Sequence, residues 1–157
     1  MIKVCLADNY PVVHFGVKSY FKDHSDISIV ANVGNFSMVK DVLYTKEIDV
    51  LVLDLDLDGL SSIYELKAII KNYTKTKIIV FSSYSEQIYA PNAIKAGVAG
   101  YVHKTAKLET LGIAIMKVHQ GQTILNDTIK RNLALIAKQN KSERLYRKLS
   151  NREIEVL

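Results

Sequence analysis

Short apolar runs alternate along the chain with longer segments in which apolar residues recur every three or four positions. The apolar runs, which are typical of strands, cover residues 3–7, 27–31, 50–53, 77–81 and 100–102. Helical spacing follows Pro11, which suits a first helical position, and recurs in residues 37–44, 62–73, 91–96 and 107–120. Five strands alternating with five helices predict an α/β fold, a doubly wound five-stranded parallel sheet covered by helices on both faces.

The pattern changes after residue 121. Residues 128–140 carry one apolar helical stripe, and residues 141–148 are polar and basic. Ser150 and Glu153 have the spacing of a capping box, which predicts that a new helix begins there. We therefore expect a first domain over residues 1–121, a helical basic linker over 122–148, and the truncated start of a second domain over 149–157.

Composition narrows the class of protein. The 157 residues suffice for one domain with a short appendage, and 48% hydrophobic with 24% charged residues excludes a disordered chain. Cys5 is the single cysteine and is expected in the core, so no internal disulfide can form. No stretch approaches the roughly 18 apolar residues of a membrane span, and Asp8 interrupts any signal peptide. We expect a cytoplasmic protein without membrane contact.

The net charge of +5 is unevenly distributed. Residues 1–121 contain 13 Lys/Arg and 12 Asp/Glu, whereas residues 122–157 contain 8 and 4. A basic tail on a nearly neutral domain is typical either of contact with a polyanion such as nucleic acid or of a solvated linker, and both interpretations stay open.

Polar residues directly follow four of the five apolar runs. They are Asp8 and Asn9, Asp54, Ser82, and His103 with Lys104. Because the carboxyl ends of parallel strands meet at one edge of a sheet, these side chains should converge. Carboxylate and amide oxygens suit Mg²⁺, a carboxylate can accept a phosphoryl group, and a lysine and a hydroxyl can offset the charge on the phosphoryl oxygens. The sequence therefore predicts a site for phosphoryl transfer.

With these residues in this order and spacing, residues 1–121 resemble the receiver domain of bacterial two-component response regulators. Residues 149–157 resemble the start of the LuxR-type helix-turn-helix of the NarL/FixJ subfamily. The resemblance implies a flavodoxin-like receiver with strand order 2-1-3-4-5. It makes Asp54 the phosphoacceptor, Ser82 the switch hydroxyl, Lys104 the site lysine and Tyr101 the aromatic that moves inward on activation. It also implies that Mg²⁺ is held by Asp8, Asn9, Asp54 and the backbone carbonyl of Asp56.

Two departures from the family pattern affect the site. The second residue of the acidic pair is usually Asp, and Asn9 supplies an amide oxygen without the charge, which predicts weaker Mg²⁺ binding. Thr105 stands where the family often has a cis proline, and a cis bond before a residue other than proline costs about 2.5–4 kcal/mol.

The resemblance implies a response regulator that accepts phosphate from a sensor histidine kinase and switches by forming a homodimer. Regulation of transcription would follow from contact with DNA only through the helix-turn-helix domain, which this chain lacks beyond its first residues. Such a protein is not an enzyme, except that it catalyses its own phosphorylation and dephosphorylation.

Two alternatives stay open. One is an atypical receiver that acts as a dimerising scaffold independently of phosphorylation. The other is a phosphatase of the haloacid-dehalogenase type, because Asp56-Leu57-Asp58-Gly59 matches its D-x-D-G signature, with Asp56 as nucleophile and Asp58 as acid and base. The four histidines show no metal-ligand spacing and are expected to be surface or packing residues.

Overall fold

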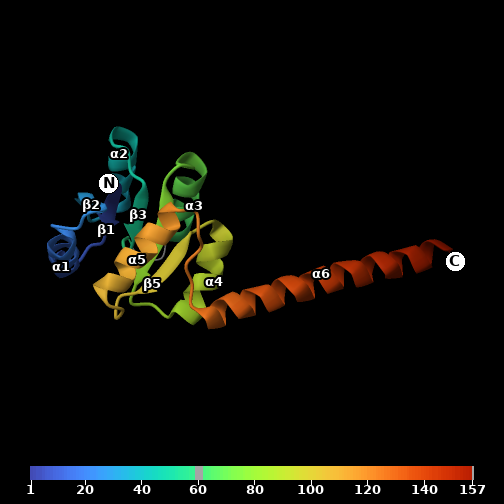
Figure 1. Cartoon of the computed structure of the whole chain (residues 1–157). Coiled ribbons are helices and arrows are strands. Elements are labelled where there is room, and N and C mark those ends of the chain that lie inside the picture. Colours follow the sequence, from blue (N-terminus) through green and yellow to red (C-terminus); the bar gives the residue numbers. More distant parts are fainter. Residues whose placement is uncertain (59–61, 157) are drawn as a thin grey trace. The chain divides into compact units, whose positions relative to one another are not determined.

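The computed structural model describes residues 1–58 and 62–156, and it divides into two compact units, Met1–Leu125 and Asn126–Leu157 (Figure 1). The first unit is a five-stranded sheet of β1 (Ile2–Ala7), β2 (Ile27–Val33), β3 (Val50–Leu53), β4 (Lys77–Ser82) and β5 (Gly100–His103). The strands run parallel in the order β2-β1-β3-β4-β5. The predicted fold class and strand order are therefore confirmed.

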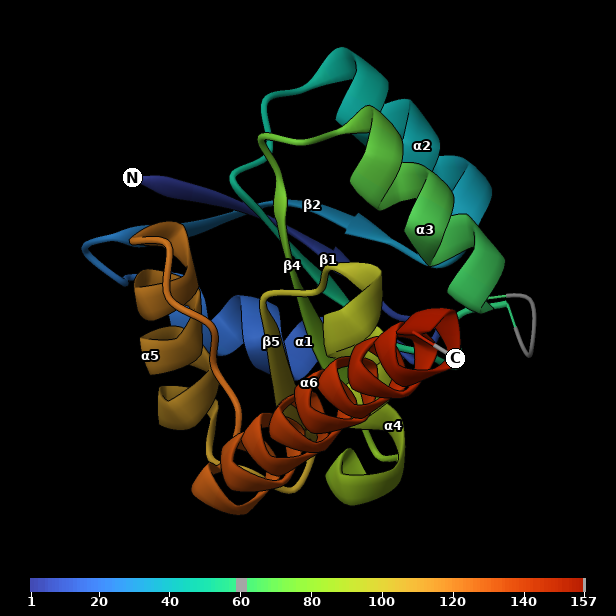
Figure 2. The same ribbon diagram turned by 90° about the vertical axis from the view of Figure 1, so that its right-hand side faces the viewer.

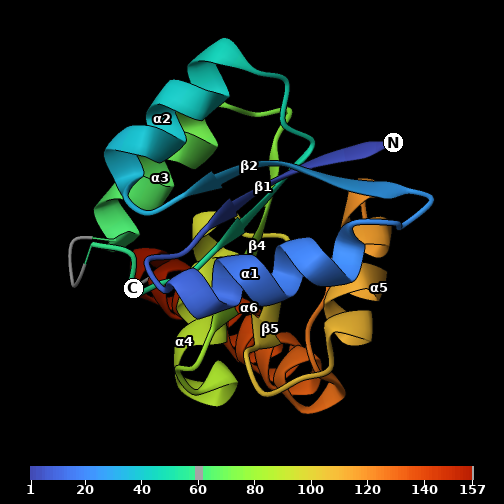
Figure 3. The same ribbon diagram turned by 90° about the vertical axis from the view of Figure 1, so that its left-hand side faces the viewer.

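The helices form two layers around this sheet. They are α1 (Pro11–Phe21), α2 (Phe36–Thr45), α3 (Ser62–Asn72), α4 (Glu86–Ala96) and α5 (Leu108–His119). α1 and α5 lie on one face, and α2, α3 and α4 lie on the other (Figure 2 and Figure 3). Pro11 occupies the first position of α1, as its sequence context predicts.

Alternation along β1 shows why the sheet needs both layers. Val4 and Leu6 belong to the core that α1 and α5 cover, and the intervening Cys5 is equally buried on the opposite face. Burial raises the pKa of the Cys5 thiol to about 12, so this side chain stays protonated and serves as core, as expected.

The structure answers two expectations about the backbone, the start of α4 and the peptide bond between Lys104 and Thr105. α4 begins at Glu86, more than one turn before the expected start, and Pro91 lies inside it. A proline there removes a helical hydrogen bond and crowds the preceding turn, yet the buried Ala90 and Ala93 pack the helix on the sheet on either side of it. Every peptide bond in the described residues is trans, including the bond between Lys104 and Thr105.

The second unit is the single helix α6 (Asp127–Val156). Its start is capped by Asn126, whose Oδ1 accepts a hydrogen bond from the Ile129 amide at 2.9 Å. The backbone stays helical through Ser150, so the separate helix expected from the capping box does not form; the side chains of Ser150 and Glu153 lie outside the described residues. No helix in the described part of the chain is long and apolar enough to cross a membrane.

Candidate functional site

The buried polar side chains of the described residues mark one edge of the sheet. They are Asp8 after β1, Asp54 after β3, and Ser82 at the end of β4, with 1%, 3% and 1% of their surface exposed. These strands are neighbours in the sheet, so their carboxyl ends bring the three side chains to the same edge, as the polar strand ends predict.

Lys104 joins two of these groups. Its Nζ lies 2.7 Å from Oδ2 of Asp54 and 2.7 Å from Oδ2 of Asp8. Burial by itself lowers the pKa of Lys104, but the hydrogen bonds to Asp54 and Asp8 outweigh it and leave the pKa raised. The ammonium is therefore charged at neutral pH and neutralises part of a pocket that contains two buried carboxylates.

The backbone fixes the other oxygens of these carboxylates. Oδ1 of Asp54 accepts a hydrogen bond from the Asp56 amide at 3.1 Å, and Oδ1 of Asp8 accepts one from the Tyr10 amide at 2.8 Å. Each acid is thus held at one oxygen by the loop that follows it and at the other by Lys104. This arrangement fixes the direction of both carboxylates before any ligand arrives.

The residues expected to hold Mg²⁺ lie together. Asn9 is exposed, and its Nδ2 is 3.5 Å from the backbone oxygen of Asp56, the carbonyl expected among the ligands. The buried Oδ2 of Asp8 has no partner among the described residues other than Lys104. Two carboxylates, an amide and a carbonyl are oxygen donors of the kind Mg²⁺ takes, so the donor set fits this ion. The donor set relies on an amide and a carbonyl beside its carboxylates. A group of three His, Cys, Asp or Glu side chains that could hold a metal occurs neither here nor elsewhere in the described chain.

The two expected switch residues meet at the loop after β4. The Ser82 hydroxyl accepts a hydrogen bond from the Tyr84 amide at 3.1 Å, and the Tyr101 hydroxyl donates to the Tyr84 carbonyl at 2.9 Å. Tyr101 is 2% exposed, so its ring occupies an inward position, and burial raises the pKa of its hydroxyl to about 12. The backbone of one residue, Tyr84, therefore connects both side chains.

Two tyrosines at the site were not singled out from the sequence. The Tyr84 hydroxyl donates to Oδ1 of Asp56 at 3.1 Å, and this bond raises the pKa of Tyr84. The ring of Tyr10 lies under the Lys104 ammonium, 5.2 Å from its centroid. Both residues follow a predicted site residue by two positions, but nothing in that spacing indicates where an aromatic side chain points.

The described hydrogen bond of Asp58 connects it to α2 and not to the acidic cluster, which consists of Asp8 and Asp54 around Lys104. Its Oδ2 accepts a hydrogen bond from the Phe36 amide at 2.8 Å, in the first turn of α2, where a carboxylate stabilises a helix. The phosphatase alternative assigned the acid–base role to Asp58, and this contact gives it a capping role in the fold.

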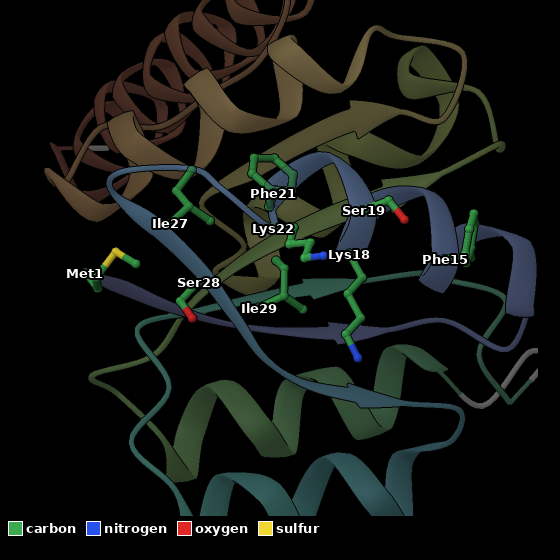
Figure 4. A pocket seen from close by; sticks show the side chains of 9 residues that line it. All are labelled: Met1, Phe15, Lys18, Ser19, Phe21, Lys22, Ile27, Ser28 and Ile29. Atoms are coloured by element: carbon green, nitrogen blue, oxygen red, sulfur yellow. The ribbon is translucent and has the colours of Figure 1, made fainter.

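A hollow of about 520 Å³ lies away from the acidic cluster, between α1 and β2 (Figure 4). Its lining combines apolar side chains, among them Phe15 and Ile29, with the cationic Lys18 and Lys22. None of the acidic-cluster residues lines it, so it is a separate feature of the surface.

A parallel sheet with two buried acids, a buried hydroxyl and a lysine at its carboxyl edge defines a doubly wound α/β domain with one charged site. The family of response regulator receiver domains matches residues 4–116, and the chain belongs to this family. It is thus a response regulator receiver domain of a two-component system.

Relatives resemble the chain over nearly its whole length. Fimbriae Z protein of Escherichia coli K12 is 28% identical over 98% of this chain and 73% of its own length. The response regulator UvrY of the same strain is 27% identical over 100% and 72%. The response regulator protein VraR of Staphylococcus aureus NCTC 8325 is 25% identical over 99% and 74%.

Solved structures share the fold. The isolated receiver domain of RcsB from Salmonella enterica serovar Typhimurium in its apo form has a TM-score of 0.77 at 20% identity, covering 85% of this chain and 99% of that one. A LuxR-family response regulator from Aurantimonas has a TM-score of 0.75 at 23% identity, covering 86% and 96%. A structure described as two RcsB dimers bound to two parallel DNAs has a TM-score of 0.72 at 20% identity, covering 85% and 68%.

Proposed function

We propose that this response regulator accepts a phosphoryl group on Asp54 from a sensor histidine kinase in a Mg²⁺-dependent reaction. The observation that carries the proposal is the Lys104 ammonium, 2.7 Å from both Asp54 and Asp8 in a buried pocket at the carboxyl edge of the sheet. A buried acid paired with a lysine in this way is arranged to become an acyl phosphate, because the ammonium can stay bound to the added anion.

The chain's own residues supply most of what the transfer needs. A carboxylate oxygen of Asp54 attacks phosphorus while the bond from phosphorus to the kinase histidine nitrogen breaks. Lys104 then faces an oxygen of the phosphoryl group, and Ser82, at the neighbouring strand end, supplies a hydroxyl for another. Bound Mg²⁺, held by Asp8, Asn9, Asp54 and the Asp56 carbonyl, would neutralise charge on the phosphoryl oxygens.

The switch follows from the hydrogen bonds around Tyr84. If Ser82 turns toward a phosphoryl group, its hydroxyl leaves the Tyr84 amide, and the Tyr84 carbonyl to which Tyr101 is bonded moves with that loop. The surface of α4, β5 and α5 changes in consequence, which favours a homodimer. The dimer would act on transcription through a helix-turn-helix domain; a structure of similar fold, described as two RcsB dimers bound to two parallel DNAs, supports the pairing of a dimer with DNA. We place the protein in the cytoplasm, and the only reactions we assign to it are its own phosphorylation and dephosphorylation.

A second candidate is a dimerising scaffold that does not depend on phosphorylation. Two observations favour it: Asn9 lacks a formal charge at the metal site, and Tyr101 already occupies the inward position. In this case the surface of α4, β5 and α5 would have the shape that binds a second copy of the chain without phosphorylation.

Labelling with acetyl phosphate and Mg²⁺, followed by peptide mapping by mass spectrometry, tests these functions. We expect one phosphoryl group on Asp54 and none in Asp54→Ala, while Asp58→Asn, which alters the acid that caps α2, is labelled like the wild type. A label on Asp56 together with turnover of a phosphomonoester would favour the phosphatase instead. Absence of any label at millimolar Mg²⁺ would leave the scaffold.

A further inference from the structure

His103 lies at the start of the turn that presents Lys104. The carbonyl of His103 accepts a hydrogen bond from the Ala106 amide at 2.9 Å, so Lys104 and Thr105 are the two central residues of a tight turn. Neither central residue is a proline or a glycine. The direction in which the Lys104 side chain leaves the backbone depends on this turn keeping its shape.

The half-buried His103 ring braces the turn from inside. Its Nδ1 is 3.1 Å from the Thr105 amide and 2.7 Å from the Thr105 hydroxyl. A backbone N–H can only donate, so Nδ1 acts as the acceptor and the ring proton belongs on Nε2. The ring thereby holds the residue directly after Lys104 by its backbone, a contact that a proline at this position would not allow.

The same ring reaches across to the neighbouring loop. Nε2 of His103 is 3.0 Å from the carbonyl oxygen of Ser83, the residue after the switch hydroxyl, to which it donates. The Lys104 amide donates to the Ser82 carbonyl at 2.9 Å, so backbone and side chain connect the same two loops. The His103 imidazole therefore links the turn that presents Lys104 to the loop that follows Ser82.

We propose that His103 is a positioning residue that holds Lys104 over Asp54 and links its turn to the loop of Ser82. The proposal rests on the proposed phosphorylation of Asp54. A lysine side chain is flexible, and losing about 1 Å of alignment in a reacting group can cost roughly a hundredfold in rate. Removing the ring should therefore slow phosphorylation while leaving the buried core intact.

The variants separate positioning from folding. His103→Leu keeps bulk and removes all three hydrogen bonds of the ring, whereas His103→Gln retains one acceptor and one donor. His119→Leu makes the same change at an exposed position in the last turn of α5. For each protein, the maximal rate of Asp54 labelling and the half-saturating acetyl phosphate concentration are measured, with thermal unfolding and the ¹⁵N–¹H NMR signal of the Lys104 ammonium.

We expect His103→Leu to lower the maximal labelling rate by about tenfold or more. It should also broaden the Lys104 ammonium signal, because an unbraced lysine exchanges its protons faster. His103→Gln should recover most of both effects, and His119→Leu should match the wild type. A His103→Leu protein with the wild-type rate and a sharp ammonium signal would overturn the proposal, as would a rate loss equal to its unfolded fraction. If the wild type takes no label, the proposed function fails, and the ammonium signal alone still decides the role of His103.

Discussion

Lys104 pairs one positive charge with two buried carboxylates. Asp8 and Asp54 each present an oxygen at 2.7 Å to its Nζ, and both acids are almost fully buried. A buried acid is stable only when it is paired and hydrogen-bonded, and here one ammonium serves two of them. One ammonium cannot balance two carboxylates, and under the proposed function the exposed Asn9 at the rim would tune how strongly Mg²⁺ is held.

The first prediction concerns Asn9→Asp. It adds a formal charge beside Asp8 and removes an amide group that now points its Nδ2 toward the Asp56 carbonyl, 3.5 Å away. Because the number of charged ligands sets the affinity of such sites, we expect Mg²⁺ to bind about tenfold more tightly and Asp54 to be labelled faster. Isothermal titration with Mg²⁺ measures the change.

A matched control for this change is Asn126→Asp, which adds the same charge at the cap of α6, in the other unit of the chain. It should leave the Mg²⁺ affinity as it is in the wild type. If Asn9→Asp binds Mg²⁺ no better than Asn126→Asp does, residue 9 is not a ligand and the proposed metal site is wrong.

At the level of single residues, the sequence located the centre of the site better than its rim. Asp8, Asp54, Ser82 and Lys104 each adjoin a strand end, and the topology of a parallel sheet then brings them together. The positions of these four side chains agree with the predicted site, whereas their roles in phosphoryl transfer stay predictions. Tyr10 and Tyr84 reach the site from loops and His103 from the last position of β5, beside a turn. There the direction of a side chain depends on turn geometry that no periodic pattern encodes. The histidine was expected to be a surface or packing residue, and its ring instead bonds two loops.

At the level of elements, the sequence predicted two helices to begin at a proline, and one of these predictions is correct and the other wrong. Pro11 begins α1, but Pro91 lies within α4, which starts at Glu86. Pro91 cannot donate a backbone hydrogen bond to the preceding turn, and the buried Ala90 and Ala93 pack the helix on the sheet on either side of it. The large apolar residues before Pro91, Ile88 and Tyr89, are both exposed, so they do not mark the face that the helix buries. Tertiary packing, and not local pattern, sets the start of this element.

The packing of α1 against α5 gives the next prediction, because two helical glycines have opposite surroundings. A Cβ on Gly112 of α5 would lie 3.2 Å from Cε1 of the buried Phe21 of α1, whereas a Cβ on Gly16 would meet nothing within 4 Å. Gly112→Val should therefore lower the free energy of unfolding by about 1–3 kcal/mol through overpacking. Gly16→Ala should raise it by about 0.5–1 kcal/mol, because glycine is a poor helix former.

Urea unfolding followed by far-UV circular dichroism measures both changes. Neither glycine adjoins Asp54 or Lys104 in the sequence, so labelling by acetyl phosphate should persist in the folded fraction of each variant. A Gly112→Val protein as stable as the wild type would show that α5 can move away from α1 freely, contrary to the close contact at Phe21.

At the level of the whole molecule, the first unit extends beyond the boundary that the sequence indicated. The change of pattern after residue 121 placed the domain end there, but Ile124 forms a parallel bridge with Gly100 of β5. The Ile124 amide donates to the Ala99 carbonyl at 2.8 Å, and its carbonyl accepts from the Tyr101 amide at 3.0 Å. Because the bridge involves a single residue, it does not form an apolar run, and the sequence pattern therefore did not indicate it.

This bridge predicts a difference between two truncations of the chain, one ending at residue 121 and the other at residue 125. Both keep the five described strands and the acidic cluster, but only the longer one keeps the two hydrogen bonds of Ile124 and the packing of its side chain against the core. At about 0.5–1.5 kcal/mol for each hydrogen bond, we expect the shorter protein to be less stable by roughly 1–3 kcal/mol. Because Tyr101 loses a backbone partner with it, the shorter protein should also show a changed NMR signal for the Tyr101 amide. Chemical denaturation of the two proteins side by side tests the point, and equal midpoints would place the end of the domain at residue 121 after all.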